Sequence, residues 1–381
     1  MRVSVLQENL HKGLSIVNRA VASRPNLPVL ANVLLTTEDS RLKLSATNLE
    51  LGINVWIGAK IETDGAVTIP SRLFYDLTGN LSPERVDLEL DPRTQTLNLR
   101  CGGTTTNIKG IDASEFPLVP EADANTGIAI PAHEFRRMIE QVVFASARDD
   151  NRPVLTGVLV RAEGNTITLA ATDGFRLSER KTILEVGIDH PMEMIIPSKT
   201  LQEVARIISD EDEEVLISIP EGRSQVMFHL REVDIVSSLI DGAFPPYERI
   251  IPNEFVTHTT VYTDELLRAC KRSEVFAKDN AYTTRVYVTP SDDGMAPGEV
   301  RVKAQSNETG DNESMIDASV DGTAVDISFN IKYLIELLNV VNDDQVILET
   351  ISSEDPCLVR PYRSDEHNEY VHVIMPMRVG Q

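Results

Sequence analysis

The chain has 381 residues, of which 41% are hydrophobic and 25% charged, and its formal net charge is −23. The apolar fraction suffices for well-packed cores, so the composition excludes a wholly disordered chain, and the length predicts two to three domains. The negative charge argues against nucleic acid as a partner, because phosphate binding needs Lys and Arg. The sequence shows no apolar run of roughly 18 residues and no cleavable leader, so we expect neither a membrane span nor secretion.

Residues that usually carry chemistry are few and scattered. Cys101, Cys270 and Cys357 are far apart and odd in number, so they predict neither a disulfide framework nor a zinc site and favour the reducing cytoplasm. The histidines form no HExxH pattern, and no GxSxG, P-loop or dinucleotide fingerprint occurs. Asp173 is expected as a turn residue before Gly174 and not as a catalytic acid. No metal or organic cofactor is implied, and a non-enzymatic role is favoured, with a dispersed triad as the alternative.

A domain-sized pattern occurs three times along the chain. Each copy opens with a strand-like segment and an amphipathic helix, in which apolar residues such as Leu10, Leu14 and Val17 recur at helical spacing. The openings are residues 3–21, 128–145 and 260–277. Matching strand-like segments follow at 30–35, 155–160 and 282–287, and then at 42–51, 167–177 and 300–308.

Each copy continues with a strand that leads into a second helix. These segments are 68–77, 195–204 and 328–337. Pro70 and Pro197 precede two of the helices, Ser71 and Ser198 are candidate caps, and Asn330 takes the corresponding place in the third copy. Closing strands are expected at 85–90, 214–219, 345–350, 96–101, 225–230 and 356–361.

Two amphipathic helices and several alternating strands per copy predict an α+β fold, in which helices cover one face of an antiparallel sheet. The expected domains are residues 1–125, 126–253 and 254–381. Duplication by itself specifies no function, and the alternative is that it only builds a larger rigid body.

Four segments carry a resemblance to a known family. They are RPNLPVL at 24–30, ATDGFRL at 171–177, DGAFPPYERIIP at 241–252 and MPMRV at 375–379. With the length and the threefold pattern, they make the whole chain similar to the bacterial DNA sliding clamps, the β subunit of the replicative DNA polymerase III holoenzyme. The resemblance implies three repeated DNA-clamp domains forming half of a ring. Two chains would close head to tail, as a homodimer around duplex DNA, and serve the polymerase as a processivity factor.

The resemblance also bears on the negative charge, because the family turns its helices toward the DNA. The expected helices 7–22, 71–80, 133–148, 199–207, 264–278 and 332–342 hold thirteen Lys and Arg against nine Asp and Glu. Their net charge is therefore +4, and the rest of the chain carries −27. A weakly positive lining would hold DNA and still allow sliding. The alternative is ordinary solvated helix faces. The candidate DNA contacts are Arg24, Arg72, Arg148, Arg152 and Lys199.

A further implication of the resemblance is an apolar cleft that binds a short linear peptide of partner proteins. The matching positions are Leu155, Thr172, Gly174, Phe175, Leu177, Pro245, Ile250, Val373, Met375 and Met377, with Arg152 and Arg249 beside them. Aliphatic and Met side chains suit a surface that accepts several peptides, although Leu155, Leu177 or Ile250 could each be a plain core residue. Pro153, Val154 and Phe175 depart from the family pattern.

The implied dimer joins the first domain of one chain to the third domain of the other, with sheet edges pairing across the seam. The matching residues are Thr106, Ile108, Val275 and Phe276, and Thr106 stands where an apolar side chain is expected. Further implied partners are the clamp loader and other clamp-binding proteins (repair polymerases, ligase, mismatch repair), and the implied location is the cytoplasm at the nucleoid. The competing hypothesis, which the acidic charge favours, is a protein-interaction scaffold without DNA encirclement.

Overall fold

The computed structural model describes residues 1–22, 24–121, 127–149, 151–188, 190–209, 213–220, 224–291, 296–363 and 369–377. The expected boundary between residues 125 and 126, and Arg378 and Val379 of the C-terminal segment, lie outside the described residues. Unit 1, the first of two compact units, comprises Met1–Arg136 and Glu203–Leu239, and unit 2 comprises Arg137–Gln202 and Ile240–Gln381. Across the ranges described, we find no helix with the length and apolar character needed to cross a bilayer.

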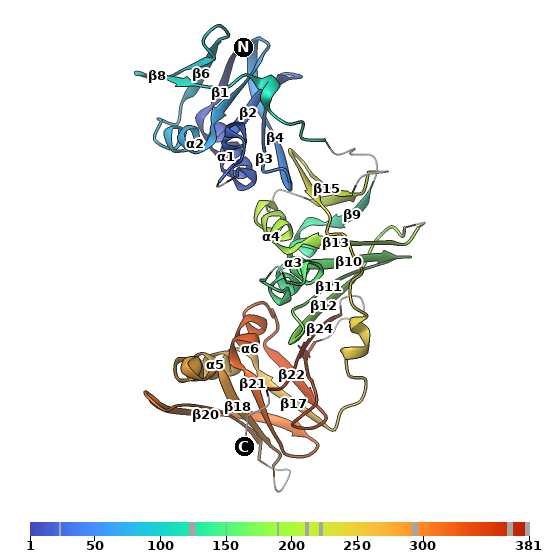
Figure 1. Ribbon diagram of the computed structural model, residues 1–381. Coiled ribbons are helices and arrows are strands. Elements are labelled where there is room, and N and C mark those ends of the chain that lie inside the picture. The colour runs from blue at the N-terminus through green and yellow to red at the C-terminus, as the bar shows by residue number, and fades with distance from the viewer. Residues whose placement is uncertain are drawn as a thin grey trace. The chain divides into compact units, whose positions relative to one another are not determined.

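The same order of elements occurs three times: a strand, a helix, four strands, a second helix and three strands (Figure 1). The first repeat consists of β1 (Arg2–Leu6), α1 (Gln7–Val17), β2 (Asn32–Glu38), β3 (Arg41–Thr47), β4 (Leu51–Thr63), β5 (Ala66–Pro70), α2 (Ser71–Gly79), β6 (Arg85–Asp91), β7 (Thr96–Cys101) and β8 (Thr104–Lys109). The second consists of β9 (Ile128–Pro131), α3 (Ala132–Val142), β10 (Gly157–Glu163), β11 (Thr166–Thr172), β12 (Arg176–Ile183), β13 (Met192–Pro197), α4 (Ser198–Ile207), β14 (Glu214–Ser218), β15 (Gln225–Leu230) and β16 (Val233–Ser238). The third consists of β17 (Thr257–Tyr262), α5 (Thr263–Ala277), β18 (Thr283–Thr289), β19 (Gly298–Ser306), β20 (Gly310–Asp321), β21 (Val325–Asn330), α6 (Ile331–Leu338), β22 (Gln345–Thr350), β23 (Cys357–Pro361) and β24 (Tyr370–Ile374). The predicted α+β fold in three repeats is confirmed.

The first helix of a repeat packs beside the second. In Figure 1, α1 lies next to α2, and α5 lies next to α6, on one face of their strands. Leu10, Leu14 and Val17 form the buried side of α1, as their helical spacing predicts. The first helices end sooner than predicted, because α1 passes into a 3-10 turn after Val17 and α5 does so after Ala277.

The two cap predictions that the structure tests have opposite outcomes. Ser71 is wrong as a cap: it is the first residue of α2, and its buried hydroxyl donates to the side chain of Asn18. Asn330 does cap α6, because its side chain accepts a hydrogen bond of 3.1 Å from the Lys332 backbone N–H. A serine at a helix start is therefore not diagnostic where another buried side chain competes for the hydroxyl.

The matched segments 42–51 and 167–177 are interrupted by turns. β3 ends at Thr47 and β4 begins at Leu51, and the same break separates β11 from β12. The pattern also missed β4 as a long strand. The first seven residues of β4 are all buried, so the alternation that predicts a half-exposed strand is absent there.

Each unit contains one twelve-stranded sheet, and each sheet continues from one repeat into the next. In unit 1, Leu51–Val55 of β4 pair with β16 of the second repeat, and Ala59–Thr63 pair with β1 of the first. In unit 2, Arg176–Arg180 of β12 pair with β24 of the third repeat. The last strand of a repeat thus completes the sheet of the preceding repeat.

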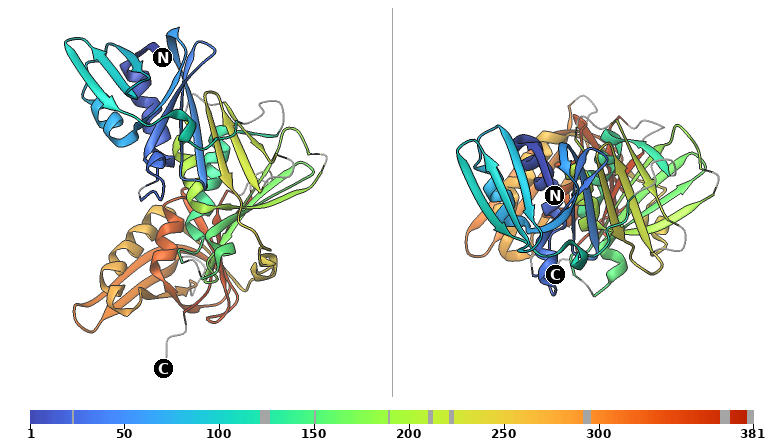
Figure 2. Two further views of the ribbon diagram at one scale, coloured as in Figure 1. Left: turned by 45° about the horizontal axis from the view of Figure 1, so that its top comes forward. Right: turned by 90° about the horizontal axis from the view of Figure 1, so that it is seen from above.

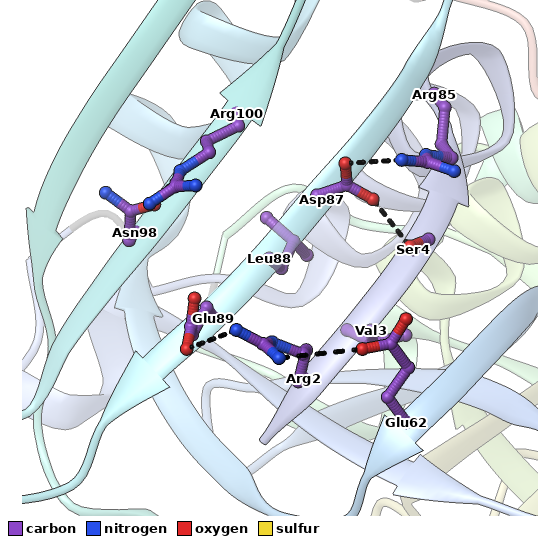
Figure 3. A pocket seen from close by; sticks show the side chains of 10 residues that line it. All are labelled: Arg2, Val3, Ser4, Glu62, Arg85, Asp87, Leu88, Glu89, Asn98 and Arg100. Atoms are coloured by element: carbon purple, nitrogen blue, oxygen red, sulfur yellow. Dashed lines mark hydrogen bonds and ion pairs between the residues drawn. The ribbon is translucent and has the colours of Figure 1, made fainter.

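The outer face of the unit 1 sheet carries paired charges. A shallow hollow there is lined by three arginines and three carboxylates from neighbouring strands, Arg2, Arg85, Arg100, Glu62, Asp87 and Glu89 (Figure 3). Arg2 pairs with Glu89 at 2.9 Å, and Arg85 pairs with Asp87 at 3.0 Å. The hydrogen bond from Ser4 (2.5 Å) and the charge of Arg85 lower the pKa of Asp87 below its ordinary value. The positive and negative side chains that line this hollow are equal in number, so the face is electrically balanced there.

The three cysteines are free and buried. Burial raises the pKa of the Cys270 and Cys357 thiols to about 12, which keeps them protonated and unreactive.

Candidate functional site

The predicted peptide cleft is built around the turn between β11 and β12. One carboxylate oxygen of Asp173 accepts hydrogen bonds from the backbone N–H groups of Phe175 (2.9 Å) and Arg176 (3.1 Å). Gly174 has a φ of +92°, a conformation that side chains disfavour. The predicted turn role of Asp173 is confirmed. The turn leaves the Phe175 side chain 62% exposed.

The apolar base beside this turn comes from three segments of unit 2. Leu177 on β12 and Val373 on β24 are directly opposite each other and 1% exposed. They belong to a buried cluster with Leu159 and Tyr247, against which Val154 packs. Beyond β24, the Met375 backbone N–H donates to the Phe175 carbonyl at 2.9 Å, so the C-terminal segment continues alongside the turn.

The remaining cleft candidates differ in exposure. Leu155 and Thr172 are buried, and Met375 and Met377 are half-buried. Exposed side chains belong to Pro245, Arg249 and Ile250, next to the 3-10 turn Tyr247–Ile250. Met375 and Met377 also line a cavity of about 1000 Å³ with residues of β21 and of the turn after β22. Leu155, Leu177 and Val373 are thus core residues that underlie the site, whereas Phe175, Ile250 and the methionines present surface.

Arg152 lies at the edge of this site. Its guanidinium donates to the Asp173 carbonyl at 2.9 Å, and a Cβ at Gly174 would lie 3.1 Å from it. This hydrogen bond ties Arg152 to the peptide cleft. To contact DNA, the Arg152 side chain would have to break this hydrogen bond or use its remaining N–H groups for the phosphate while it keeps the bond to Asp173.

Arg176 is a site residue that the sequence analysis missed. Its side chain is 3% exposed; it donates to Asp173 at 3.1 Å and to the Phe144 carbonyl at 2.7 Å, and it pairs with Glu336 on α6. The guanidinium carbon lies 4.4 Å from the centre of the Tyr333 ring. Arg176 therefore joins β12 of the second repeat to α6 of the third, directly beneath the cleft turn. The ATDGFRL segment contains this arginine, but nothing local indicates its distant partners.

His372 is a second residue that the sequence did not single out. It is fully buried on β24, and its Nδ1 is 2.5 Å from the Ser178 hydroxyl across the seam with β12. Burial, and to a lesser extent the charge of Arg176, lower the pKa of His372 to about 3. Nε2 has no hydrogen-bond partner among the described residues. The ring is therefore held neutral between the second and third repeats.

The buried neutral state of His372 predicts a pH dependence. An unfolded histidine takes up a proton near its ordinary pKa of about 6.5, whereas the folded one resists protonation down to a pKa of about 3. Neutral His372 therefore makes its full contribution to the free energy of unfolding above pH 6.5. This contribution is lost as the pH falls from 6.5 toward 3, by at most about 1.4 kcal/mol per pH unit. We expect His372→Gln to flatten the fall of melting temperature between pH 6.5 and 4.5. Parallel curves for the two proteins would contradict this assignment.

The cations predicted to face DNA have different surroundings. The side chains of Arg24, Arg72 on α2 and Lys199 on α4 are exposed. Arg148 is 82% exposed but pairs with Glu336 at 3.0 Å. Arg19, which lies in the 3-10 turn after α1 and was not a candidate, pairs with Glu203 at 2.7 Å. Carboxylates therefore offset part of the positive charge of Arg148 and Arg19.

The predicted dimer residues lie in two places, on an edge strand of unit 1 and at the end of a helix in unit 2. Thr106 and Ile108 are on β8, the outermost strand of the unit 1 sheet, whose hairpin with β7 is cyan in Figure 2. Val275 and Phe276 are at the end of α5, which packs on β20. Val275 is 60% exposed, whereas Phe276 is half-buried against the core of the third repeat.

Comparisons with known proteins agree with this geometry. Family models described as the N-terminal, central and C-terminal domains of the DNA polymerase III beta subunit match residues 1–120, 129–246 and 248–378. A Synechococcus elongatus protein named "Beta sliding clamp" is 31% identical over 366 residues, which are 95% of this chain and 96% of that protein. The Bacillus subtilis "Beta sliding clamp" is 28% identical over 99% of this chain and 100% of its own.

Solved structures show the same fold. The crystal structure of the DNA polymerase sliding clamp from Bacillus subtilis has a TM-score of 0.92 at 27% identity, and that of the DNA polymerase III subunit beta from Pseudomonas aeruginosa has 0.89 at 28%; each covers 100% of both chains. Three α+β repeats with sheets that run from repeat to repeat therefore define a DNA-clamp fold. The chain belongs to the DNA polymerase III beta subunit family, the beta sliding clamps.

Proposed function

We propose that two copies of this chain close head to tail into a ring around duplex DNA and tether the replicative polymerase to it. Such a protein acts by topology and needs no catalytic group. Family membership supports this role. The main structural support for a ring is the pairing of the last strand of one repeat with the long strand of the preceding repeat.

This pairing of a last strand with the long strand of the preceding repeat occurs twice within the chain. The last strand of the first repeat, β8, and the long strand of the third repeat, β20, remain without such a partner among the described residues. β16 pairs with β4, and β24 pairs with β12. In the described chain, β8 pairs along its length only with β7, and the Gly310–Asp317 part of β20 pairs only with β19. β8 of one copy therefore fits the open half of β20 in another. Two such contacts close a ring, since each copy supplies both edges.

The repeats also predict the register of this contact. Ile235 is opposite Ile53 where β16 pairs with β4, and the structurally equivalent residues His372 and Ser178 are opposite each other where β24 pairs with β12. The corresponding pair across the dimer seam is Thr106 opposite Asn312. Its neighbours are Thr105 opposite Glu313 and Asn107 opposite Asp311. A threonine is suitable there, because its hydroxyl can bond to the Asn312 amide, which already accepts from Ser273 at 3.2 Å. The exposed Val275 follows Ser273 on the same helix and extends the contact.

Retention on circular DNA tests the proposed function. A closed ring is expected to stay on nicked circular DNA in salt that abolishes ordinary electrostatic binding, and to slip from the same DNA once it is linearised. Because the family relies on a loader, the ring is first assembled on the DNA with the loader or by cross-linking. Equal retention on both forms would reject encirclement and leave the acidic protein-interaction scaffold as the better account.

We propose Arg24, Arg72, Arg148, Arg152 and Lys199 as DNA contacts. Replacing all five with Gln removes five positive charges from a surface that holds the duplex only weakly. We expect the salt dependence of binding to short linear duplex DNA, on which no topological link retains the ring, to fall, with a slope lowered by up to about 0.9 per lost phosphate contact. The control replaces Arg2, Arg85 and Arg100, whose face is electrically balanced. An unchanged slope in the fivefold variant would remove these residues from the DNA surface.

We propose that partner peptides bind across the turn of β11 and β12, with their apolar side chains against Met375, Phe175, Ile250 and Met377 and their polar groups near Arg152 and Arg249. Met375→Ala is expected to weaken a clamp-binding peptide by about tenfold, since it removes one adaptable apolar wall. Fluorescence anisotropy with a labelled peptide measures this. Val186→Ala is a control in the same unit, because Val186 is 78% exposed and belongs neither to the cleft nor to the proposed dimer edges. Equal affinities for both variants would exclude Met375 from the cleft.

The finer organisation is part of the same proposal. We place the domains at residues 1–125, 126–253 and 254–381, in line with the three family matches. The loader, repair polymerases, ligase and mismatch repair proteins are proposed as users of the ring. The proposed place of action is the cytoplasm, at the nucleoid.

A further inference from the structure

We propose that unit 1 contains a second binding site, for a small amphipathic molecule with one negative charge, where the first repeat joins the second. A cavity of about 350 Å³ lies there. This volume is within the range of sites that bind small organic molecules, roughly 300–1,000 Å³. All of its lining residues belong to unit 1, and none of them is part of the cleft or of the dimer edges.

The cavity exists because β4 changes partners there. β16 pairs as far as Val55 and β1 begins at Ala59, so Trp56–Gly58 bridge a gap between the two strands. The Trp56 backbone N–H still donates to the Glu232 carbonyl at 3.0 Å, which holds the turn after β15 across the gap. A Cβ added at Gly58 would meet no atom within 4 Å, so this position borders open space.

Helix α1 closes the other side of the cavity. Gly13 packs so tightly that a Cβ there would lie 2.7 Å from Leu44 and 3.1 Å from Ile57. Because α1 already contacts β3 and β4 this closely at Gly13, the helix cannot move further inward to fill the cavity. The apolar lining comes from α1, β4, the end of α4 and the start of β16, and consists of Ile16, Val55, Trp56, Ile57, Ile207 and Val233. A ligand therefore needs an apolar body.

The charged lining selects the sign of the ligand. Arg41 and Arg231 line the cavity together with Glu232. The Arg41 guanidinium is 3.4 Å from the Glu232 carboxylate and 5.7 Å from the centre of the Trp56 ring. Lys12 also lines the cavity, so three cationic side chains and one carboxylate leave a positive excess there, in a chain of net charge −23. Because guanidinium groups bind carboxylates in a planar, two-pronged geometry, the proposed ligand is an apolar group that carries a single carboxylate.

The site contains its own reporter. Trp56 is the single tryptophan of the chain and is 9% exposed. Octanoate is a suitable probe, since it has no aromatic absorbance. We expect octanoate to change the Trp56 emission in a saturable way and to raise the melting temperature of the protein. Octan-1-ol and octylammonium have the same alkyl chain as octanoate but no negative charge. Their affinity should be lower than that of octanoate by about tenfold or more.

Two variants separate the cavity from general effects on the protein. Gly58→Val fills open space on a strand and should weaken octanoate by about tenfold or more, whereas Gly103→Val, whose added Cβ also meets no atom within 4 Å, should leave it within about twofold. Arg231→Gln should weaken octanoate but not octan-1-ol. A non-saturable response, equal binding of octanoate and octylammonium, or unchanged binding in both Gly58→Val and Arg231→Gln would overturn the proposal. If Gly58→Val does not fold, Arg231→Gln decides alone.

Discussion

Arg176→Met is expected to lower the free energy of unfolding of unit 2 by about 3 kcal/mol, one of the two largest effects that the structure predicts. The substitution keeps much of the side-chain volume and removes the charge. Asp173 and Glu336, which are 15% and 31% exposed, would then lose the guanidinium between them, and the Phe144 carbonyl would lose its donor. Partly buried groups left in this way are costly because water cannot fully replace the lost partner.

Thermal and urea denaturation measure the effect, and a matched exposed pair provides the control. Arg161 is 37% exposed and pairs with Glu193 at 2.9 Å and Glu248 at 2.8 Å. Arg161→Met makes the same chemical change and should cost well under about 1 kcal/mol, as exposed ion pairs do. Because Arg176 also lies under the cleft turn, peptide binding should weaken in the Arg176 variant. Equal destabilisation by the two substitutions would refute the role given to Arg176.

Asn107→Pro is expected to convert the dimer into a monomer without unfolding unit 1. The β7–β8 hairpin closes with Cys101 opposite Thr104, so the backbone groups of alternate residues, Thr105, Asn107 and Lys109, face away from β7. Proline removes the N–H of Asn107 at the open edge and leaves the backbone hydrogen bonds of the hairpin intact. The side-chain hydrogen bond from Asn98 to Asn107 (2.8 Å) is lost in this variant and equally in Asn107→Ala. Edge strands tolerate proline when that edge faces solvent, and pairing strands do not.

A loss of about 3 kcal/mol is roughly a hundredfold per seam, so the proposed dimer, which two seams close, should be weaker by about ten-thousandfold, and sedimentation or native mass measurement detects this. Asn107→Ala keeps the N–H and should remain dimeric. The register has a separate check: Thr106→Cys combined with Asn312→Cys should form cross-linked dimers on oxidation, and the native cysteines, being buried, should not interfere. A dimeric proline variant, or a cysteine pair that fails to cross-link, would show that these strands do not pair.

Part of this protein follows from its sequence alone, because the signals involved are local. Helical spacing placed the start and the buried side of α1 correctly from residues within one segment, such as Leu10 and Leu14. The alternating closing strands and the threefold repeat also followed from neighbouring residues and from self-similarity. The glycine and aspartate of the β11–β12 turn predicted a tight turn, which their own backbone contacts then formed.

Only the tertiary structure decided which distant segments meet. Arg176 pairs with Glu336 160 positions away, and Ser178 meets His372 194 positions away. The change of partners along β4 leaves no pattern in the sequence, since its buried residues look alike whichever strand lies beside them. The ion pair of Arg148, the open edges of β8 and β20 and the cavity beside Trp56 all result from this long-range pairing. Periodicity reports which side of an element is buried, whereas strand order and side-chain partners depend on how the whole chain packs.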